Sequence, residues 1–150
     1  MSTHYHGTPT EKQALGTYVK LSRAADAVTF HINQHLHDVN LTISQFGVLE
    51  ALHHIGPLCQ RDLAAKILKS SGNLTLVIDN LAKRGLVYRQ RDSNDRRFIN
   101  IHLTAEGAAL IQELFPKHVA IVVETMNALT SDQQQQLSNL CRQLGLSLAD

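Results

Sequence analysis

The sequence contains no tryptophan, only two cysteines and only three prolines among its 150 residues. Cys59 and Cys141 lack the close spacing of zinc-binding motifs, so they predict no metal site. The chain has no apolar run long enough to cross a bilayer and no basic-then-apolar leader at its start. These absences predict a cytoplasmic protein with no membrane partner, a setting that disfavours a structural disulfide.

Positive charge is concentrated in the middle of the chain, although the formal net charge is only +1. Residues 57–103 contain nine lysines and arginines against four acidic residues, which gives +5, whereas the remainder has five against nine, which gives −4. This asymmetry predicts an anionic partner for the middle third of the chain. A length of 150 residues fits one domain with a sizeable core.

Residues 70–84 are predicted to form a helix that begins after Ser70, a good capping residue, and ends at Gly85, which suits the left-handed position after a helix. The apolar positions that recur at three- and four-residue spacing are Leu74, Val77, Ile78 and Leu81. The opposite face carries Ser71, Asn73, Thr75, Leu76, Asn80 and Lys83. Most of these side chains are short and polar, which suits base edges and phosphates at close approach.

Two strands are predicted after this helix, over residues 86–89 and 98–103, and the turn between them has the sequence RDSNDRR. A short helix is also predicted over residues 59–68, just before the helix over residues 70–84. Two helices joined by such a short turn form a helix-turn-helix. A hairpin beside a helix-turn-helix is a wing. Further helices are predicted over residues 11–37, 42–55, 104–129 and 130–145, and the first of them has a second apolar face that needs a partner.

The order of these elements, with the segments SSGNLTLVIDNLAKRGLVYR, DSNDRRFINIHLT and AEG, closely resembles the MarR family of winged-helix transcriptional regulators. The resemblance covers residues 10–145. It implies a mainly α fold with a small β-hairpin wing, in one domain over residues 1–150. A winged helix-turn-helix lobe would occupy residues 41–104, and dimerisation helices would occupy residues 10–40 and 105–146. It also implies an obligate homodimer that regulates transcription, usually as a repressor. No enzyme is predicted, because nothing in the sequence pairs a base with an oriented nucleophile or clusters acids for magnesium.

The resemblance further implies contacts with double-stranded DNA. The helix over residues 70–84 would enter the major groove, where the Asn73 amide is the candidate for a bidentate contact with adenine. The wing-tip Arg97, with Arg96 beside it, would enter the adjacent minor groove. The full set of predicted DNA-contacting residues is Lys69, Ser70, Ser71, Asn73, Thr75, Asn80, Arg89, Arg96 and Arg97. Two-fold symmetry predicts a roughly palindromic operator with half-sites about one helical turn apart.

Two acidic residues of this region are predicted to be structural. Asp95 is not expected to contact DNA, because phosphates repel an acid. It would instead pair with Arg97 or a neighbouring arginine and stiffen the wing. Asp79 would form an ion pair with a wing arginine. For Arg89 the alternative is a solvated edge-strand charge that deters aggregation.

The resemblance implies a small-molecule effector, an aromatic carboxylate or a phenolic compound, bound between the dimerisation helices and the winged lobe. Arg23, His53 and His54 are the candidates for that cleft. Neither a cofactor nor a metal is predicted, because no Cys or Glu completes a ligand set with the histidines. Two alternatives stay open. One is an oxidant-sensing regulator that uses Cys59, predicted to cap the short helix with Asp62 as in a capping box, where the helix N-terminus favours a thiolate. The other is an architectural or protein-interaction winged helix.

Overall fold

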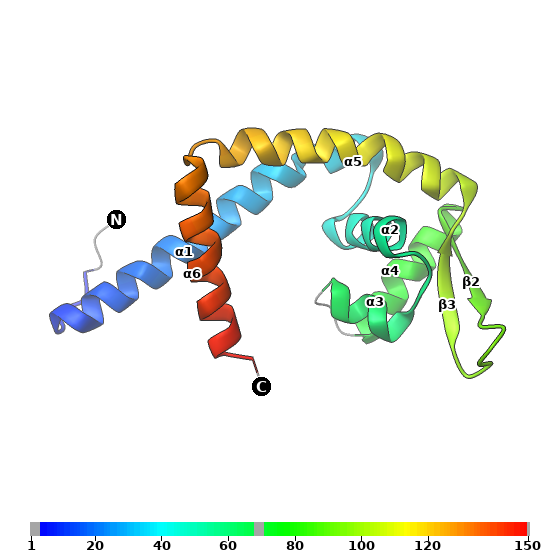
Figure 1. Ribbon diagram of the computed structural model, residues 1–150, viewed down its shortest axis with the longest axis horizontal. Helices are drawn as coiled ribbons and strands as arrows, with labels where there is room; N and C mark the ends of the chain where they lie inside the picture. The colour runs from blue at the N-terminus through cyan, green and yellow to red at the C-terminus, as the bar shows by residue number, and fades with distance from the viewer. Residues whose placement is uncertain (1–3, 68–70, 150) are drawn as a thin grey trace. The chain divides into compact units, whose positions relative to one another are not determined.

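The computed structural model describes residues 4–67 and 71–149, and the chain divides into two compact units (Figure 1). The helical unit comprises residues up to 34 together with those from 121 onward, and the winged unit comprises residues 35–120. The architecture is mainly helical with one small antiparallel sheet, which confirms the predicted fold class. None of the helices that the structure describes is long and apolar enough to cross a membrane.

The helical unit is built from α1 (Pro9–Asn33), the end of α5 (Ala105–Met126) and α6 (Ser131–Ser147). Thr8 caps α1, since its hydroxyl accepts from the Glu11 amide and the Glu11 carboxylate accepts from the Thr8 amide. This capping box starts the helix at Pro9, earlier than predicted. The prediction that α6 ends at Gly145 is wrong, because the helix continues to Ser147.

The winged unit contains most of the 3-10 helix η1 (Gln34–Val39), then α2 (Ile43–Ile55), α3 (Gln60–Lys66) and α4 (Ser71–Lys83). The predicted hairpin is confirmed as β2 (Val87–Arg91) and β3 (Ile99–Leu103), which pair from Val87 opposite Leu103 to Arg91 opposite Ile99. A third strand, β1 (Leu58–Cys59), was not predicted. It pairs with β3, so the sheet order is β1-β3-β2.

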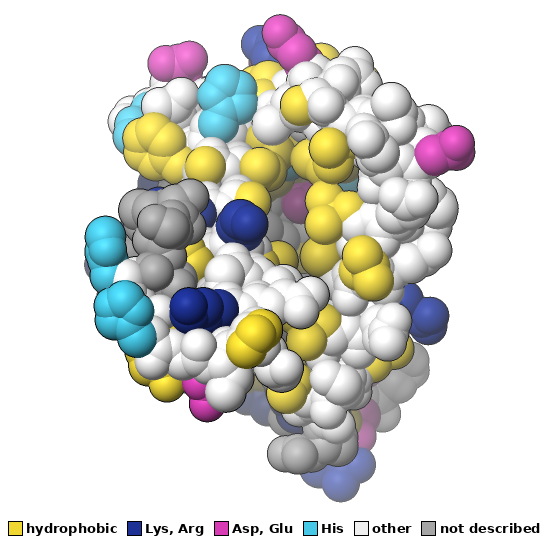
Figure 2. Space-filling view, turned by 90° about the vertical axis from the view of Figure 1, so that its left-hand side faces the viewer, with side chains coloured by type: hydrophobic (Ala, Val, Ile, Leu, Met, Phe, Trp, Pro, Cys, Tyr) yellow, Lys and Arg dark blue, Asp and Glu magenta, His cyan; other side chains and the backbone are white. Residues whose placement is uncertain are grey.

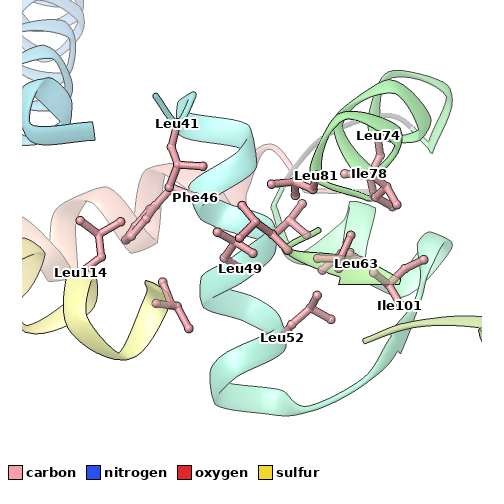
Figure 3. Close-up of a cluster of buried hydrophobic side chains, with 14 of the residues drawn as sticks. Leu41, Phe46, Leu49, Leu52, Leu63, Leu74, Ile78, Leu81, Ile101 and Leu114 are labelled. Carbon is pink, nitrogen blue, oxygen red and sulfur yellow. The ribbon is translucent and has the colours of Figure 1, made fainter. Parts of the chain in front are cut away.

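The hydrophobic core of the winged unit lies where α2, α3 and α4 meet the sheet (Figure 3). Leu49, Leu63, Leu74, Ile78 and Leu81 are fully buried. For Leu74, Ile78 and Leu81 the helical spacing predicts this burial. Ile101 brings β3 into the same cluster. Replacing one such leucine by alanine typically lowers the free energy of unfolding by about 2–5 kcal/mol. This core therefore holds α4 against α2, α3 and the sheet.

The junction between the wing and α5 explains the AEG segment. Thr104 Oγ1 donates to the carbonyl oxygen of Gly85 at 2.6 Å and accepts from the Gly107 amide at 3.0 Å. A Cβ atom at Gly107 would lie 2.0 Å from the Leu86 carbonyl oxygen, so only glycine fits there. Gly85 itself has φ 72°, the left-handed conformation that ends α4 as predicted.

Candidate DNA-binding surface

Four of the nine residues predicted to contact DNA lie on α4. Asn73 and Thr75 are exposed near the beginning of the helix, and Asn80 is half-buried further along. Lys69 and Ser70 lie outside the described residues, and Ser71 is described only as the first residue of α4.

The front of α4 is tied to α3 by a contact that sequence reasoning missed. Gln60, the first residue of α3, donates from Nε2 to Thr75 Oγ1 at 2.6 Å. Because Thr75 already accepts this bond, part of its side chain positions α4 on α3. Two polar residues 15 positions apart give no local signal of such a pair.

The middle of α4 is tied to the wing by an ion pair. Arg89 Nη2 donates to Asp79 Oδ1 at 2.5 Å. Arg89 stands opposite Ile101 in the sheet register, and Ile101 is buried in the core, so this side chain leaves the sheet on its core side. The predicted pair between Asp79 and a wing arginine therefore forms with Arg89, and it orients the wing relative to α4.

The end of α4 is anchored by Arg84, which was not predicted as a functional residue. Its guanidinium donates from Nη1 to the Asn40 carbonyl oxygen at 2.7 Å and from Nη2 to the Val39 carbonyl oxygen at 3.0 Å. The acceptors are backbone groups more than 40 positions earlier, so side-chain identities carry no signal of the contact. Three polar contacts thus hold α4, at its front, middle and end.

Asp92 organises the turn of the wing. Its carboxylate accepts from the amides of Asn94 and Asp95 at 2.8 and 2.9 Å and from Asn100 Nδ2 at 2.9 Å. The backbone hydrogen bonds from Asp95 and Asn94, with the side-chain bond from Asn100, lower the pKa of Asp92. Asp92 was not among the predicted site residues, although the Asp-Ser-Asn turn composition was its signal.

The wing tip presents Arg97 on an oriented but exposed side chain. Asp95 accepts from Arg97 Nε at 2.9 Å and from Nη2 at 2.7 Å, while the Arg97 side chain remains 84% exposed. The side-chain hydrogen bond from Arg97 is the main cause that lowers the pKa of Asp95. Arg96 is exposed, and its carbonyl oxygen accepts from Arg91 Nη1 at 2.5 Å. The wing tip is therefore pre-ordered, with the guanidinium of Arg97 at its end.

The candidate effector residues lie in both units. Arg23 is exposed on α1, whereas His53 and His54 lie in the last turn of α2 with their rings edge-to-face at 4.9 Å. His54 Nδ1 donates to the Glu50 carbonyl oxygen at 2.9 Å, and the His54 ring packs on Phe115 of α5 at 4.5 Å. Within the winged unit, His54 thus belongs to a cluster of rings between α2 and α5.

His35 and His118 join this ring cluster and were not predicted as site residues. His35 Nε2 and His118 Nδ1 lie 3.0 Å apart, and the Phe46 ring packs on His118 at 4.5 Å. Desolvation by burial lowers the pKa of both imidazoles. In a hydrogen bond between two neutral rings, one donates and the other accepts. Throughout the part of the chain that the structure describes, no three His, Cys, Asp or Glu residues are placed to hold a metal ion.

Cys59 lies at the N-cap of α3, as predicted, but the predicted capping box is wrong. Its thiol makes no capping hydrogen bond with any described residue, because sulfur is a weak acceptor. The half-buried thiol instead lines a cavity of about 320 Å³ together with Asp62, Asp92 and Asp95. Cys59 and Cys141 are both free.

An exposed helix carried on a helix-turn-helix, with an ordered basic wing beside it, defines a winged-helix DNA-binding protein. The MarR family model matches residues 41–99. The chain is 33% identical over 138 residues to the HTH-type transcriptional regulator MhqR of Bacillus subtilis (strain 168), an alignment that covers 92% of this chain and 94% of MhqR. The chain therefore belongs to the MarR family of transcriptional regulators.

Solved structures agree with this assignment. AbsC, a MarR family transcriptional regulator from Streptomyces coelicolor, superposes with a TM-score of 0.82 at 24% identity, over 96% of this chain and 97% of AbsC. BpsR of Bordetella bronchiseptica, a protein whose DNA binding is regulated by 6-hydroxynicotinic acid, superposes with a TM-score of 0.77 at 27% identity over the whole of both chains. The first likeness supports the fold, and the predicted family resemblance is confirmed.

Proposed function

We propose that the protein is a homodimeric repressor that binds a pseudo-palindromic operator, with α4 in the major groove and Arg97 in the adjacent minor groove of each half-site. The observation that carries the proposal is the assembly of α4 and the wing. The polar face of α4 is open, while Thr75, Asp79 and Arg84 hold the helix to the rest of the winged unit. Arg97 extends from the wing tip with its guanidinium oriented by Asp95. A pre-ordered basic surface of this kind suits groove recognition, because little side-chain entropy is lost on binding.

The helical unit supports the proposed homodimer through its exposed apolar surface. Apolar side chains that are more than a third exposed there include Tyr5, Leu15, Tyr18, Leu21, Phe30, Val123, Leu137, Leu140, Leu144, Leu146 and Leu148. A groove of about 370 Å³ between α1 and α6 is lined by four of them, Leu21, Leu137, Leu140 and Leu144. Figure 2 shows hydrophobic side chains exposed on the drawn face. Large exposed apolar patches on soluble proteins mark interaction sites, so a second copy is the proposed occupant.

Footprinting of the DNA upstream of the protein's own and adjacent genes tests the proposal. We expect a protected site with two-fold symmetry, whose half-sites lie about 10–10.5 base pairs or a multiple apart. A competing random duplex at physiological salt should displace little protein from this site. Equal competition by random duplex would instead support an architectural winged helix, which binds through the salt-sensitive backbone contacts alone.

We also propose that a small aromatic or phenolic effector releases the operator. The support is the regulation of BpsR by a hydroxylated aromatic acid, together with a ring cluster in this chain that includes His54 and Phe115. Within the winged unit the candidate contacts are His53 and His54, with His35 and His118 added from the geometry. Arg23, the third candidate from the sequence, belongs to the helical unit. A gel-shift titration with a panel of hydroxylated aromatic acids tests this. An effector should raise the operator Kd of the wild type, and a panel without any effect would contradict the proposal.

A further inference from the structure

One apolar side chain of α4 is explained neither by the core nor by the contacts described above. Leu74, Ile78 and Leu81 are completely buried, whereas Leu76 is 65% exposed. Successive residues of an α-helix are rotated by about 100°, so Leu76 lies on the side of α4 opposite these three buried residues. It therefore occupies the centre of the outward face. A single exposed leucine is ordinary on most surfaces, but this one lies in the middle of the surface proposed to enter the groove.

The neighbours of Leu76 on the outward face are polar or small. Asn73 lies three residues before it, Asn80 four residues after it, and Lys83 one turn beyond Asn80. One turn before Leu76 the sequence has Gly72, which has no side chain and therefore permits a close approach of the helix to a ligand. The leucine is thus framed by groups that can bind base edges and phosphates, while it has no hydrogen-bonding capacity of its own.

The major groove offers one kind of apolar group to such a side chain. Each base pair presents hydrogen-bond donors and acceptors there, and only thymine adds a methyl group, at C5. A leucine facing a donor or acceptor would bury it without a partner, which is unfavourable. A leucine facing a thymine methyl group removes apolar surface from water on both partners.

We propose that Leu76 is a specificity-determining residue that packs on the C5 methyl group of a thymine in each half-site. The inference rests on the proposed insertion of α4 into the major groove. Burial of one methyl group contributes about 0.8 kcal/mol, so loss of the contact should raise the operator Kd about four-fold for one half-site and about fifteen-fold for both.

Replacement of thymine by deoxyuridine tests the contact, because it removes only the methyl group. The operator is first selected from a random duplex library with the wild-type protein. Each symmetric thymine pair is then replaced by deoxyuridine, and Kd is measured for the wild type and for Leu76→Ala. We expect one thymine pair at which deoxyuridine weakens wild-type binding about fifteen-fold and leaves the binding of Leu76→Ala unchanged. No sensitive pair, or equal sensitivity in both proteins, would overturn the inference.

Two control variants separate this inference from the proposed function. Ile43→Ala removes a comparably exposed apolar side chain, 54% exposed on α2, and should leave Kd unchanged. Asn73→Ala tests the insertion of α4 itself. If Asn73→Ala weakens binding while the deoxyuridine effect is the same with and without Leu76, only the role of Leu76 fails. If neither Asn73→Ala nor Leu76→Ala changes Kd, the proposed docking of α4 fails and the inference fails with it. Thermal melts verify that all three variants fold.

Discussion

The pairing of Asp95 with Arg97 leads to a prediction whose sign separates two physical effects. Asp95 is an acid at the tip of a surface proposed to face phosphates, so simple electrostatics predicts that its removal strengthens DNA binding. The geometry argues the opposite. Asp95 binds Arg97 through Nε and Nη2, whereas Nη1 donates no hydrogen bond to any described residue. The carboxylate thus holds the guanidinium in one orientation and leaves part of it available to the groove.

The magnitude follows from the cost of ordering an arginine. Immobilising a long side chain on binding costs about 0.5–1.5 kcal/mol, so a variant with a free Arg97 should bind about two- to ten-fold more weakly for each half-site of the operator. Asp95→Ala is the perturbation that releases Arg97. Arg97→Ala, which removes the groove contact itself, should weaken binding about ten-fold or more. Arg97→Lys should lose nearly as much, because an ammonium group cannot replace the fork of the guanidinium.

Gel-shift titrations of the four proteins on the selected operator, repeated at several salt concentrations, measure these effects. The expected order of affinity is wild type, Asp95→Ala, then the two Arg97 variants. In the Arg97→Ala background, Asp95→Ala should cause no further loss, since the acid acts through the arginine. Tighter binding by Asp95→Ala at every salt concentration would refute the orienting role, because it would show that the charge of the acid dominates. Unchanged affinity of Arg97→Ala would refute the proposed minor-groove contact.

Three further predictions concern stability, assembly and redox chemistry. Gly107→Ala should lower the free energy of unfolding by about 1–3 kcal/mol in urea denaturation, because its Cβ would overlap the Leu86 carbonyl oxygen; Gly145→Ala, with open space around it, is the matched control and should not destabilise the protein. Leu140→Asp places a charge on the apolar face of α6, where Leu140 is 64% exposed, and should convert the proposed dimer to monomer in light scattering, whereas a persistent dimer would exclude α6 from the interface. Cys59→Ser should retain operator binding, and hydrogen peroxide should not release the wild type, because oxidation is favoured at exposed thiolates and Cys59 is half-buried; release of the wild type but not of the variant would instead establish oxidant sensing.

The elements that the sequence predicted well are those with a local pattern. The helical spacing of Leu74, Ile78 and Leu81 predicts α4, and the Asp-Ser-Asn turn between alternating segments predicts the hairpin. Strand β1 was missed because two residues cannot show periodicity, and its pairing with β3 joins segments about 40 positions apart. Helix α6 runs past Gly145 because that glycine is exposed and a single glycine costs a helix only about 1 kcal/mol.

The same distinction between local patterns and long-range contacts applies to the candidate site. The chemistry of its residues was predictable from their types, including an ion pair for Asp79 and one for Asp95. The partner of Asp79 was not predictable, because the sheet register decides which wing arginine faces α4. The contacts of Arg84 with two backbone carbonyl oxygens and the contact of His35 with His118 are set by tertiary packing, over separations of 44 to 83 positions. Such contacts leave no mark in a local pattern.

The contacts of Arg84 and the contact between His35 and His118 lie at opposite ends of η1. This arrangement predicts that protonation of the two histidines affects the position of α4. His35 near one end of η1 meets His118 of α5, and the carbonyl oxygens of Val39 and Asn40 at the other end accept from Arg84 of α4. Because burial lowers the pKa of both imidazoles, they are neutral at pH 7 and become protonated only at lower pH. Asp38 near His35 and Glu50 near His118 oppose this shift. Protonation of both rings removes the hydrogen bond between them and places two positive charges side by side. Their repulsion should displace η1 and disturb the contacts of Arg84 that hold α4.

We therefore expect operator affinity to fall as the pH is lowered from 7.5 to values below 6.5, the ordinary pKa of histidine, at constant ionic strength. His118→Gln should flatten this dependence, because glutamine does not titrate. Arg84→Met should bind more weakly than the wild type already at pH 7.5 and should also show a flatter profile, because η1 no longer contacts α4. His4→Gln, at an exposed residue near the N-terminus, is the control for the remaining histidines and should keep the wild-type profile. If Arg84→Met keeps the full pH dependence while His118→Gln loses it, the ring cluster acts on DNA binding by a route other than η1.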